Sequence, residues 1–284
     1  MVVLVTGAQG QLGQALKAAS VNYSDIEFYF AGSAEADVTN KESLEEIFSR
    51  LKPQFCINAA AYTAVDKAES EPEKAYAINV IGAANLAAAC KAFGTVLIHI
   101  STDFVFDGSK ESPYTEEDVT NPQSIYGTTK RDGEVAIQNI LEEHYIVRTS
   151  WLYSQYSNNF MKTMLRLASE RDTLSVVNDQ TGTPTNANDL ANAVIAIIHY
   201  NATAKDKNFG LYHYSNEGQC SWYDFAKEIF RVNNITIDIK PIATANYPTP
   251  AKRPVYSVMD KNKIKHAFSL AINSWQDSLK AITK

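Results

Sequence analysis

The chain has 284 residues, 45% of them hydrophobic and 20% charged, which suits an ordinary globular protein of one large or two smaller domains. Its formal net charge of -6 argues against a nucleic-acid-binding protein, because such proteins normally present a basic face. The opening residues, MVVLVTGAQG, have no basic region and only a short apolar run, so we expect no signal peptide.

Short β-rich runs alternate with longer helical stretches over the first 150 residues. We expect strands at residues 2–5, 26–30, 55–58, 95–101 and 145–149, and helices at 11–20, 41–51, 73–93 and 124–143. Strands that are apolar on both faces and alternate with helices indicate a parallel sheet covered on both sides. The predicted fold class is therefore α/β, a doubly wound parallel sheet of the Rossmann type.

A glycine-rich turn follows the first strand. Residues 6–13 read TGAQGQLG, with glycines at positions 7, 10 and 13. These glycines allow a tight turn, a close backbone approach to a pyrophosphate, and close packing of helix on strand. The free N–H groups at the start of the next helix favour phosphate. Its place between the first strand and the first helix favours a dinucleotide-binding loop over a tight turn without a ligand.

The end of the second strand leaves the choice of nucleotide open. Residues 30–33 read FAGS, without the acid that contacts a ribose 2′-hydroxyl or the arginine that accommodates a 2′-phosphate. Asp37 and Val38 come later and are expected near the adenine. Both NADPH and NADH are therefore compatible with the sequence.

The fourth strand and the helix after the next loop carry the candidate chemistry. Thr102 and Asp103 end the strand at the edge where this fold places its ligands. Tyr126 and Lys130, four residues apart in SIYGTTKRDG, share one helix face. We expect Tyr126 to give a proton to a ketone oxygen that gains negative charge during hydride transfer. Lys130 is expected to lower the Tyr126 pKa and hold ribose hydroxyls, and Thr102 to donate to the same substrate oxygen.

A second tyrosine–lysine pair with the same spacing lies late in the chain, at Tyr223 and Lys227 in SWYDFAKE. No glycine turn or Ser-Thr-Asp strand end precedes it. The sequence from Ser221 is typical of a helix start. Its expected packing face consists of Trp222, Phe225, Ile229 and Phe230. We therefore expect Tyr223 to be a surface or edge residue.

Beyond Thr149 the loops lengthen and aromatic residues become frequent. Residues 246–254, NYPTPAKRP, contain three prolines and exclude a regular helix or central strand. We predict an NAD(P)-binding domain at 1–150, with part of 185–215. A smaller α/β substrate-binding domain is predicted at 151–184 and 216–284.

The cysteines and the apolar stretches indicate where the protein works. The three cysteines, at positions 56, 90 and 220, lack the spacing of metal ligands and suit a reduced, cytoplasmic protein. The weakly polar stretch 187–198 carries Asn188, Asp189 and Asn192, so we expect no membrane span. We expect neither nucleic acid nor membrane as a partner, and a homodimer is compatible with the sequence.

These residues together resemble the extended short-chain dehydrogenase/reductase superfamily and, within it, the dTDP-4-dehydrorhamnose reductase family. The resemblance runs nearly end to end. Its most specific stretches are GAQGQLG (7–13), NAAAYTAVDKAESEP (58–72), STDFVFDG (101–108), NPQSIYGTTKRDGE (121–134), VRTSWLY (147–153), NNFMKTMLRLA (158–168) and YPTPAKRP (247–254). It implies an NAD(P)H-dependent oxidoreductase that reduces the 4-keto group of the nucleotide sugar dTDP-4-dehydro-6-deoxy-L-mannose, giving dTDP-L-rhamnose.

The resemblance also implies roles for individual residues. Tyr126 would be the proton donor, Lys130 its partner and Thr102 the third catalytic residue. The cofactor would contact Gly7, Gly10, Gln11, Leu12 and Gly13 at the pyrophosphate, Asp37 and Val38 at the adenosine, and Ala61, Tyr62 and Thr63 on the nicotinamide side. The substrate would contact Thr102, Asp103, Trp151 and Arg253, the arginine as a bidentate donor to the diphosphate.

Departures from the family pattern and rival functions also bear on the prediction. Some members bridge two subunits through magnesium held partly by an acid on the first helix, but residues 14–17 read QALK, so we expect no metal. An epimerase of the same superfamily stays open, because it uses the same tyrosine. A dehydratase is disfavoured, because Phe104 stands where a second acid is needed. A further alternative is a non-catalytic regulatory subunit of the methionine adenosyltransferase type, which would not need a proton donor such as Tyr126.

Overall fold

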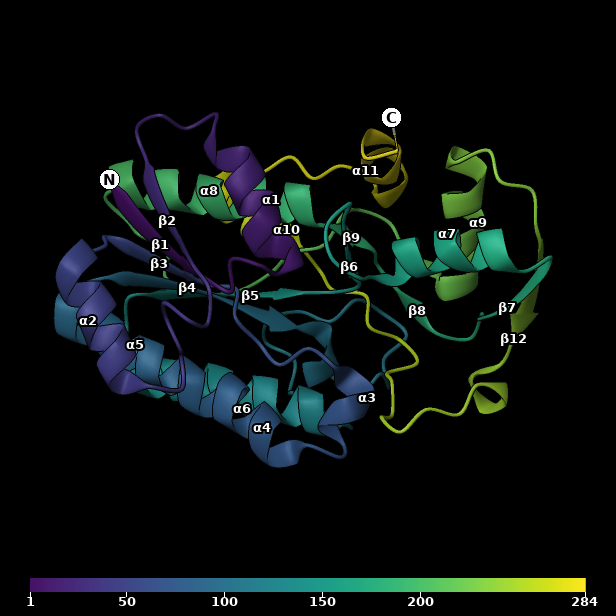
Figure 1. The fold of residues 1–284 in the computed structure, drawn as a ribbon, viewed down its shortest axis with the longest axis horizontal. Coiled ribbons are helices and arrows are strands. Elements are labelled where there is room, and N and C mark those ends of the chain that lie inside the picture. The colour runs from purple at the N-terminus through teal and green to yellow at the C-terminus, as the bar shows by residue number, and fades with distance from the viewer. Residues whose placement is uncertain (284) are drawn as a thin grey trace.

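The computed structural model of the protein describes residues 1–283, and a six-stranded parallel sheet lies at its centre (Figure 1). The strands are β1 (Val2–Thr6), β2 (Glu27–Ala31), β3 (Phe55–Asn58), β4 (Val96–Thr102), β5 (His144–Thr149) and β10 (Gly210–His213). Their order across the sheet is β10-β5-β4-β3-β1-β2. The chain winds outward on both sides of β1, so the strand order reverses between β1 and β3. Such a reversal opens the crevice in which doubly wound sheets bind ligands.

Helices cover both faces of this sheet (Figure 1). One face carries α1 (Gln11–Ser20), α8 (Ala187–Thr203) and α10 (Asn262–Phe268), and the other α2 (Lys41–Leu51), α5 (Gly82–Phe93) and α6 (Ile125–Ile140). Val3 and Val5 pack into the first layer, while Leu4 between them packs into the second. Alternate side chains of one strand thus serve both layers, which explains why the strands are apolar throughout. The predicted α/β class is confirmed.

The helix expected at 73–93 is interrupted. It consists of α4 (Pro72–Tyr76), a π-helical turn η1 (Ala77–Ile81) and α5. Within the turn, Asn79 Oδ1 accepts a hydrogen bond from Tyr62 N at 2.9 Å, and its Nδ2 donates to Thr129 Oγ1 at 3.1 Å. By length and composition alone this run, Pro72–Phe93, could cross a membrane, but half of its most apolar window is buried and α5 packs on the sheet.

The second lobe lies beyond the carboxyl ends of the central strands (Figure 1). It contains the helices α7 (Phe160–Glu170), α9 (Trp222–Val232) and α11 (Trp275–Ala281), and the parallel pair β7 (Thr173–Val177) and β12 (Asp238–Ile242). This lobe also contains two short strand pairs. In one, β6 (Leu152–Tyr153) pairs with β9 (Thr185–Asn186), and in the other, β8 (Thr181–Gly182) pairs with β11 (Cys220–Ser221). A separate core of Met161, Leu174, Phe225, Ile229 and Trp275 holds it together.

The expected strands agree with the structure to within one residue at each end, but several short elements were not expected. These are α3 (Val65–Ala68), the 3-10 turns η2 (Asp103–Val105) and η3 (Thr244–Asn246), and β10. The helix expected at 124–143 begins at Ile125 and ends at Ile140. The domain boundaries stay a prediction. Ile264 and Phe268 of α10 pack in the core under the large sheet, which favours assigning that part of 216–284 to the larger unit.

Candidate active site

A cavity of about 570 Å³ opens at the carboxyl ends of β1, β3, β4 and β5. The expected site residues that line it are Gly10, Gln11, Leu12, Ala61, Thr63, Thr102, Asp103, Tyr126, Lys130, Trp151 and Arg253. Gly7, Gly13, Asp37, Val38 and Tyr62 do not line it. Three buried atoms at its wall, Ser101 Oγ, Asp103 Oδ2 and Thr149 Oγ1, have no hydrogen-bond partner within the described residues. Buried polar atoms without partners are unfavourable, so this wall suits a polar ligand.

The glycine turn has the geometry expected of a phosphate cradle. Gly7 has a φ of +70°, and a Cβ there would lie 2.5 Å from the backbone of Ala59. A Cβ at Gly13 would lie 2.5 Å from Gly7 O. Gly10 is the N-cap of α1 and provides no side-chain cap, so the first-turn N–H groups are available to an anion. Gly7 and Gly13 therefore shape the turn, while Gly10 lines the cavity.

The other expected cofactor residues are placed around this turn. Asp37 is exposed and its Oδ1 accepts from Thr39 N at 2.9 Å, while buried Val38 packs against Gly82. The Tyr62 hydroxyl donates to Glu71 Oε2 at 2.8 Å. The adenosine and nicotinamide roles of these three residues stay predictions.

Tyr126 lies in the first turn of α6. Ser124 caps this helix, its Oγ accepting from Gly127 N at 3.2 Å. The Tyr126 ring meets Phe104 edge-on at 5.5 Å between centroids. Burial raises the pKa of Tyr126 to about 12, the Thr102 hydroxyl lowers it, and the Asp103 charge raises it. The phenol therefore stays protonated at neutral pH, as a proton donor requires.

Lys130 lies one turn after Tyr126 on α6, and its side chain is held against β4. Its Nζ donates to Ile100 O at 2.7 Å and lies 3.2 Å from His99 Nε2. Burial lowers the pKa of Lys130 to about 8, while the Glu134 charge raises it. Burial of the phenol outweighs the effects of its neighbours in this arrangement, and the expectation that Lys130 lowers the Tyr126 pKa stays a prediction.

Two stacked tryptophans of the second lobe form an aromatic wall of the cavity. Trp151 has a φ of +46°, and its ring stacks on Trp222 with centroids 3.5 Å apart and planes 8° apart. A Cβ at Gly182 would lie 2.5 Å from the Trp151 ring, so that position suits only glycine. Trp222, which we expected on a packing face, lines the cavity. Sequence reasoning missed it because nothing near it in sequence points to Trp151.

Arg253 reaches the cavity from the proline-rich segment. Its Nη1 and Nη2 donate to the two Asp66 oxygens at 2.9 and 2.7 Å. The Arg253 hydrogen bond holds the pKa of Asp66 below its usual range. The guanidinium is thus fixed at the rim, where it could also meet an anionic ligand.

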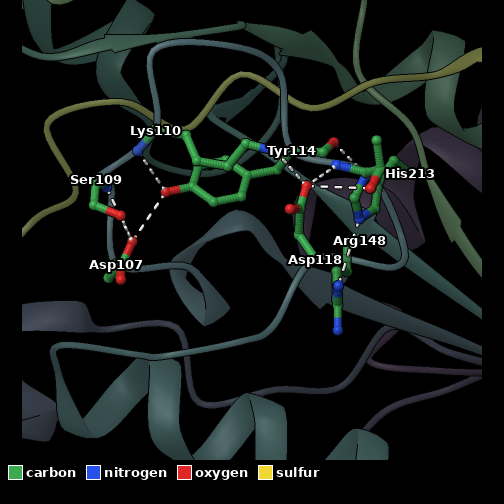
Figure 2. A network of polar contacts seen from close by, with 8 residues as sticks. Asp107, Ser109, Lys110, Tyr114, Asp118, Arg148 and His213 are labelled. Atoms are coloured by element: carbon green, nitrogen blue, oxygen red, sulfur yellow. Dashed lines mark hydrogen bonds and ion pairs between the residues drawn. The ribbon is translucent and has the colours of Figure 1, made fainter.

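The loop between Thr102 and Tyr126 is fastened to β10 by a polar network (Figure 2). The Tyr114 hydroxyl donates to Asp107 Oδ1 at 3.0 Å, and Tyr114 O lies 3.1 Å from His213 Nδ1. The Lys110 ammonium pairs with Asp118 Oδ2 at 2.6 Å. These contacts order the segment that joins two of the candidate catalytic residues.

The second tyrosine–lysine pair and the cysteines lie away from the cavity. Tyr223 packs beside the second-lobe core, with Lys227 Nζ 5.3 Å from its ring centroid, and neither residue lines the cavity. The three cysteines are free and buried. Among residues 1–283, no group of three or more His, Cys, Asp or Glu side chains is arranged to hold a metal ion.

Comparison with known proteins adds to this geometry. The family model described as RmlD substrate binding domain matches residues 1–284. A dTDP-4-dehydrorhamnose reductase of Aggregatibacter actinomycetemcomitans is 42% identical over 99% of this chain and 97% of its own. A crystal structure of that enzyme from Clostridium acetobutylicum has a TM-score of 0.93 at 43% identity, covering 99% of this chain and 98% of its own. One from Bacillus anthracis, in complex with NADP, has a TM-score of 0.94 at 40% identity with the same coverages.

Proposed function

This chain belongs to the RmlD substrate binding domain family, and on that premise we propose that it is an NADPH-dependent dTDP-4-dehydrorhamnose reductase. It reduces the 4-keto group of dTDP-4-dehydro-6-deoxy-L-mannose to give dTDP-L-rhamnose. One observation carries the proposal: the glycine turn, Thr102, Tyr126 and Lys130 line the same cavity.

The cavity suits a dinucleotide. Gly10, Gln11 and Leu12 offer backbone N–H groups to the pyrophosphate at the start of α1. Ala61 and Thr63, which line the cavity, would contact the nicotinamide side of the cofactor, and Lys130 would contact its ribose. When bound, the reduced nicotinamide supplies the hydride. NADPH is favoured over NADH, because a relative covering nearly the whole chain was solved with NADP.

Tyr126 supplies the proton in this mechanism. The substrate oxygen gains negative charge as its carbon accepts the hydride, and the protonated phenol of Tyr126 gives it a proton. Thr102, whose hydroxyl lies beside that phenol, donates a hydrogen bond to the same oxygen. The net change is one hydride and one proton added across the C=O bond.

The substrate would occupy the part of the cavity next to the second lobe. Asp103 and Trp151 would contact the sugar, and Arg253 the diphosphate. The free, buried cysteines support a cytoplasmic location, and a homodimer stays part of the proposal.

The test is oxidation of NADPH in the presence of the keto-sugar nucleotide, with NADH as the comparison cofactor. Stoichiometric consumption is expected of a reductase, whereas an epimerase regenerates its cofactor. Tyr126→Phe should lower turnover at least about a hundredfold, the usual scale for losing a general acid, while NADPH binding survives. Tyr223→Phe is the matched control and should leave turnover nearly unchanged. Near-normal turnover of Tyr126→Phe would remove this residue from the mechanism.

A further inference from the structure

A row of buried polar side chains crosses the sheet beneath the cavity and ends at Lys130. Thr6 Oγ1 donates to Asn58 Oδ1 at 2.9 Å, and Asn58 Nδ2 lies 2.9 Å from His99 Nδ1. His99 Nε2 in turn lies 3.2 Å from Lys130 Nζ. Thr6, Asn58, His99 and Lys130 are 0, 2, 1 and 2% exposed, so water is excluded and these four side chains must satisfy one another or nearby backbone groups.

The backbone fixes the orientation of Asn58. Ala60 N donates to Asn58 Oδ1 at 3.1 Å, and a backbone N–H has no other role than donor. The amide oxygen must therefore face Ala60, which leaves the amide nitrogen facing His99. An amide nitrogen can only donate, so His99 Nδ1 is an acceptor.

This arrangement sets the tautomer of His99. Complete burial, the largest influence, holds the pKa of His99 well below its usual value, so the ring is neutral. A neutral imidazole that accepts at Nδ1 carries its proton on Nε2. The Nε2–H group therefore points at Lys130 Nζ.

Two donors would face each other here if Lys130 were an ammonium. An ammonium has three donors and no acceptor, whereas a neutral amine keeps a lone pair that can accept from His99 Nε2–H. The amine can still donate to Ile100 O, at 2.7 Å. The neutral form of Lys130, unlike the ammonium, leaves no two donors facing each other in this row.

We propose that His99, oriented by Asn58, is a positioning residue that favours the neutral amine of Lys130 in the cofactor-free protein, and that binding of an anionic dinucleotide in the cavity makes Lys130 take up a proton from the solvent. Negative phosphates favour the ammonium, and turning Nζ toward the ligand releases it from His99. The second half of this proposal, the protonation of Lys130 on binding, rests on the proposed cofactor. The first half, the neutral state of Lys130 in the cofactor-free protein, does not.

Other ionisable groups surround Lys130. Glu134 and Tyr126 lie on α6 itself, His99 on β4, Asp103 on η2, and Arg148, paired with Glu134, on β5; η1 has no ionisable side chain. At pH 8.5 Asp103, Tyr126 and His99 do not titrate, because the pKa of Asp103 is about 6, that of Tyr126 is about 12, and His99 stays neutral. Lys130, with a pKa of about 8, is thus the group beside the cavity that can gain a proton near pH 8.5.

The first half is tested on the cofactor-free protein by NMR of ¹⁵N-labelled lysine side chains. One Nζ resonance, absent in Lys130→Met, should titrate at least about one pH unit below the others, as the buried environment demands. His99→Gln, whose amide oxygen can accept from an ammonium, should move that resonance back toward the others. His144→Gln is the control, because His144 is buried on β5 but contacts Leu141 O, not Lys130. Titration of the Lys130 signal with the rest would overturn the inference.

The second half is tested by calorimetry of NADPH binding at pH 8.5 in phosphate and in Tris. The dependence of the binding heat on buffer should show uptake of about 0.5–1 proton per site. The uptake should fall toward zero in His99→Gln and persist in His144→Gln. Binding without uptake would overturn the protonation of Lys130 alone, whereas absence of NADPH binding would overturn the proposed function itself.

Discussion

Asp103 places a carboxyl group in the cavity wall away from water. It is 2% exposed, Thr102 Oγ1 donates to its Oδ1 at 3.0 Å, and its Oδ2 has no partner within residues 1–283. Burial raises the pKa of Asp103 to about 6, although the hydroxyls of Ser257 and Thr102 act in the opposite direction. The folded protein therefore binds this proton more tightly than the unfolded chain does. Stability from this group is present at acid pH and is lost as the pH rises from about 4 through about 6.

Replacement of Asp103 by Asn should accordingly stabilise the protein only where the carboxylate is charged. At pH 8 we expect Asp103→Asn to raise the free energy of unfolding by about 1–3 kcal/mol, since the charge that burial penalises is gone. At pH 4 the variant and the parent should differ little, because the folded parent already holds the proton. Urea unfolding at both pH values measures this. A gain of equal size at pH 4 and pH 8 would contradict the assignment.

Helix α6 carries Tyr126 and Lys130, and a buried ion pair fixes it to the sheet. Arg148 on β5 donates from Nε and Nη2 to the two oxygens of Glu134, at 2.9 and 2.6 Å. Both side chains are nearly buried, and Phe106 lies under the guanidinium at 5.1 Å. A buried pair contributes little against an apolar replacement, but breaking it leaves one charge unpaired.

We therefore expect Glu134→Gln to lower the free energy of unfolding by about 3–5 kcal/mol, because Arg148 stays charged and buried. The double variant Glu134→Leu with Arg148→Met should recover most of that loss. The control is Glu170→Gln, which breaks the exposed Arg166–Glu170 pair and should change stability by less than about 0.5 kcal/mol. Equal effects of Glu134→Gln and Glu170→Gln in urea unfolding would show that burial of the pair does not matter.

Local patterns predicted the elements far better than the contacts between them. The glycines of the first turn and the apolar strands predicted the parallel sheet. Tight backbone geometry requires glycine, and burial on both faces requires apolar residues, so both features are visible in the sequence. The π-helical turn at Asn79 has no comparable sequence pattern, because the Asn79 side-chain amide hydrogen-bonds to Tyr62 and Thr129, which lie outside the turn. His99 was overlooked inside an apolar strand. Its role arises only because β3 and β4 pair in a register that sets Asn58 opposite it.

At the scale of the whole molecule, the cavity is completed by segments from both lobes. Trp222 stacks on Trp151 at its wall, and Arg253 meets Asp66 from a segment 187 residues away in sequence. Neither pairing can be read from local sequence, which is why Arg253 was expected at the diphosphate without its partner being named. The ion pair is 25% exposed at Arg253 and 40% at Asp66, so its contribution to stability should be small.

Arg253 should therefore matter for the substrate more than for the fold. We expect Arg253→Gln to raise the KM for the sugar nucleotide at least about tenfold, equal to about 1.4 kcal/mol, because a bidentate donor to the diphosphate is lost. The NADPH affinity and the midpoint of urea unfolding should change little. Lys252→Gln is the matched control, since Lys252 is the adjacent cation and its ammonium donates a hydrogen bond to the exposed Gln123 Oε1 at 3.3 Å. If Arg253→Gln instead lowers stability while KM stays constant, the arginine fastens the proline-rich segment to α3 and does not bind the substrate.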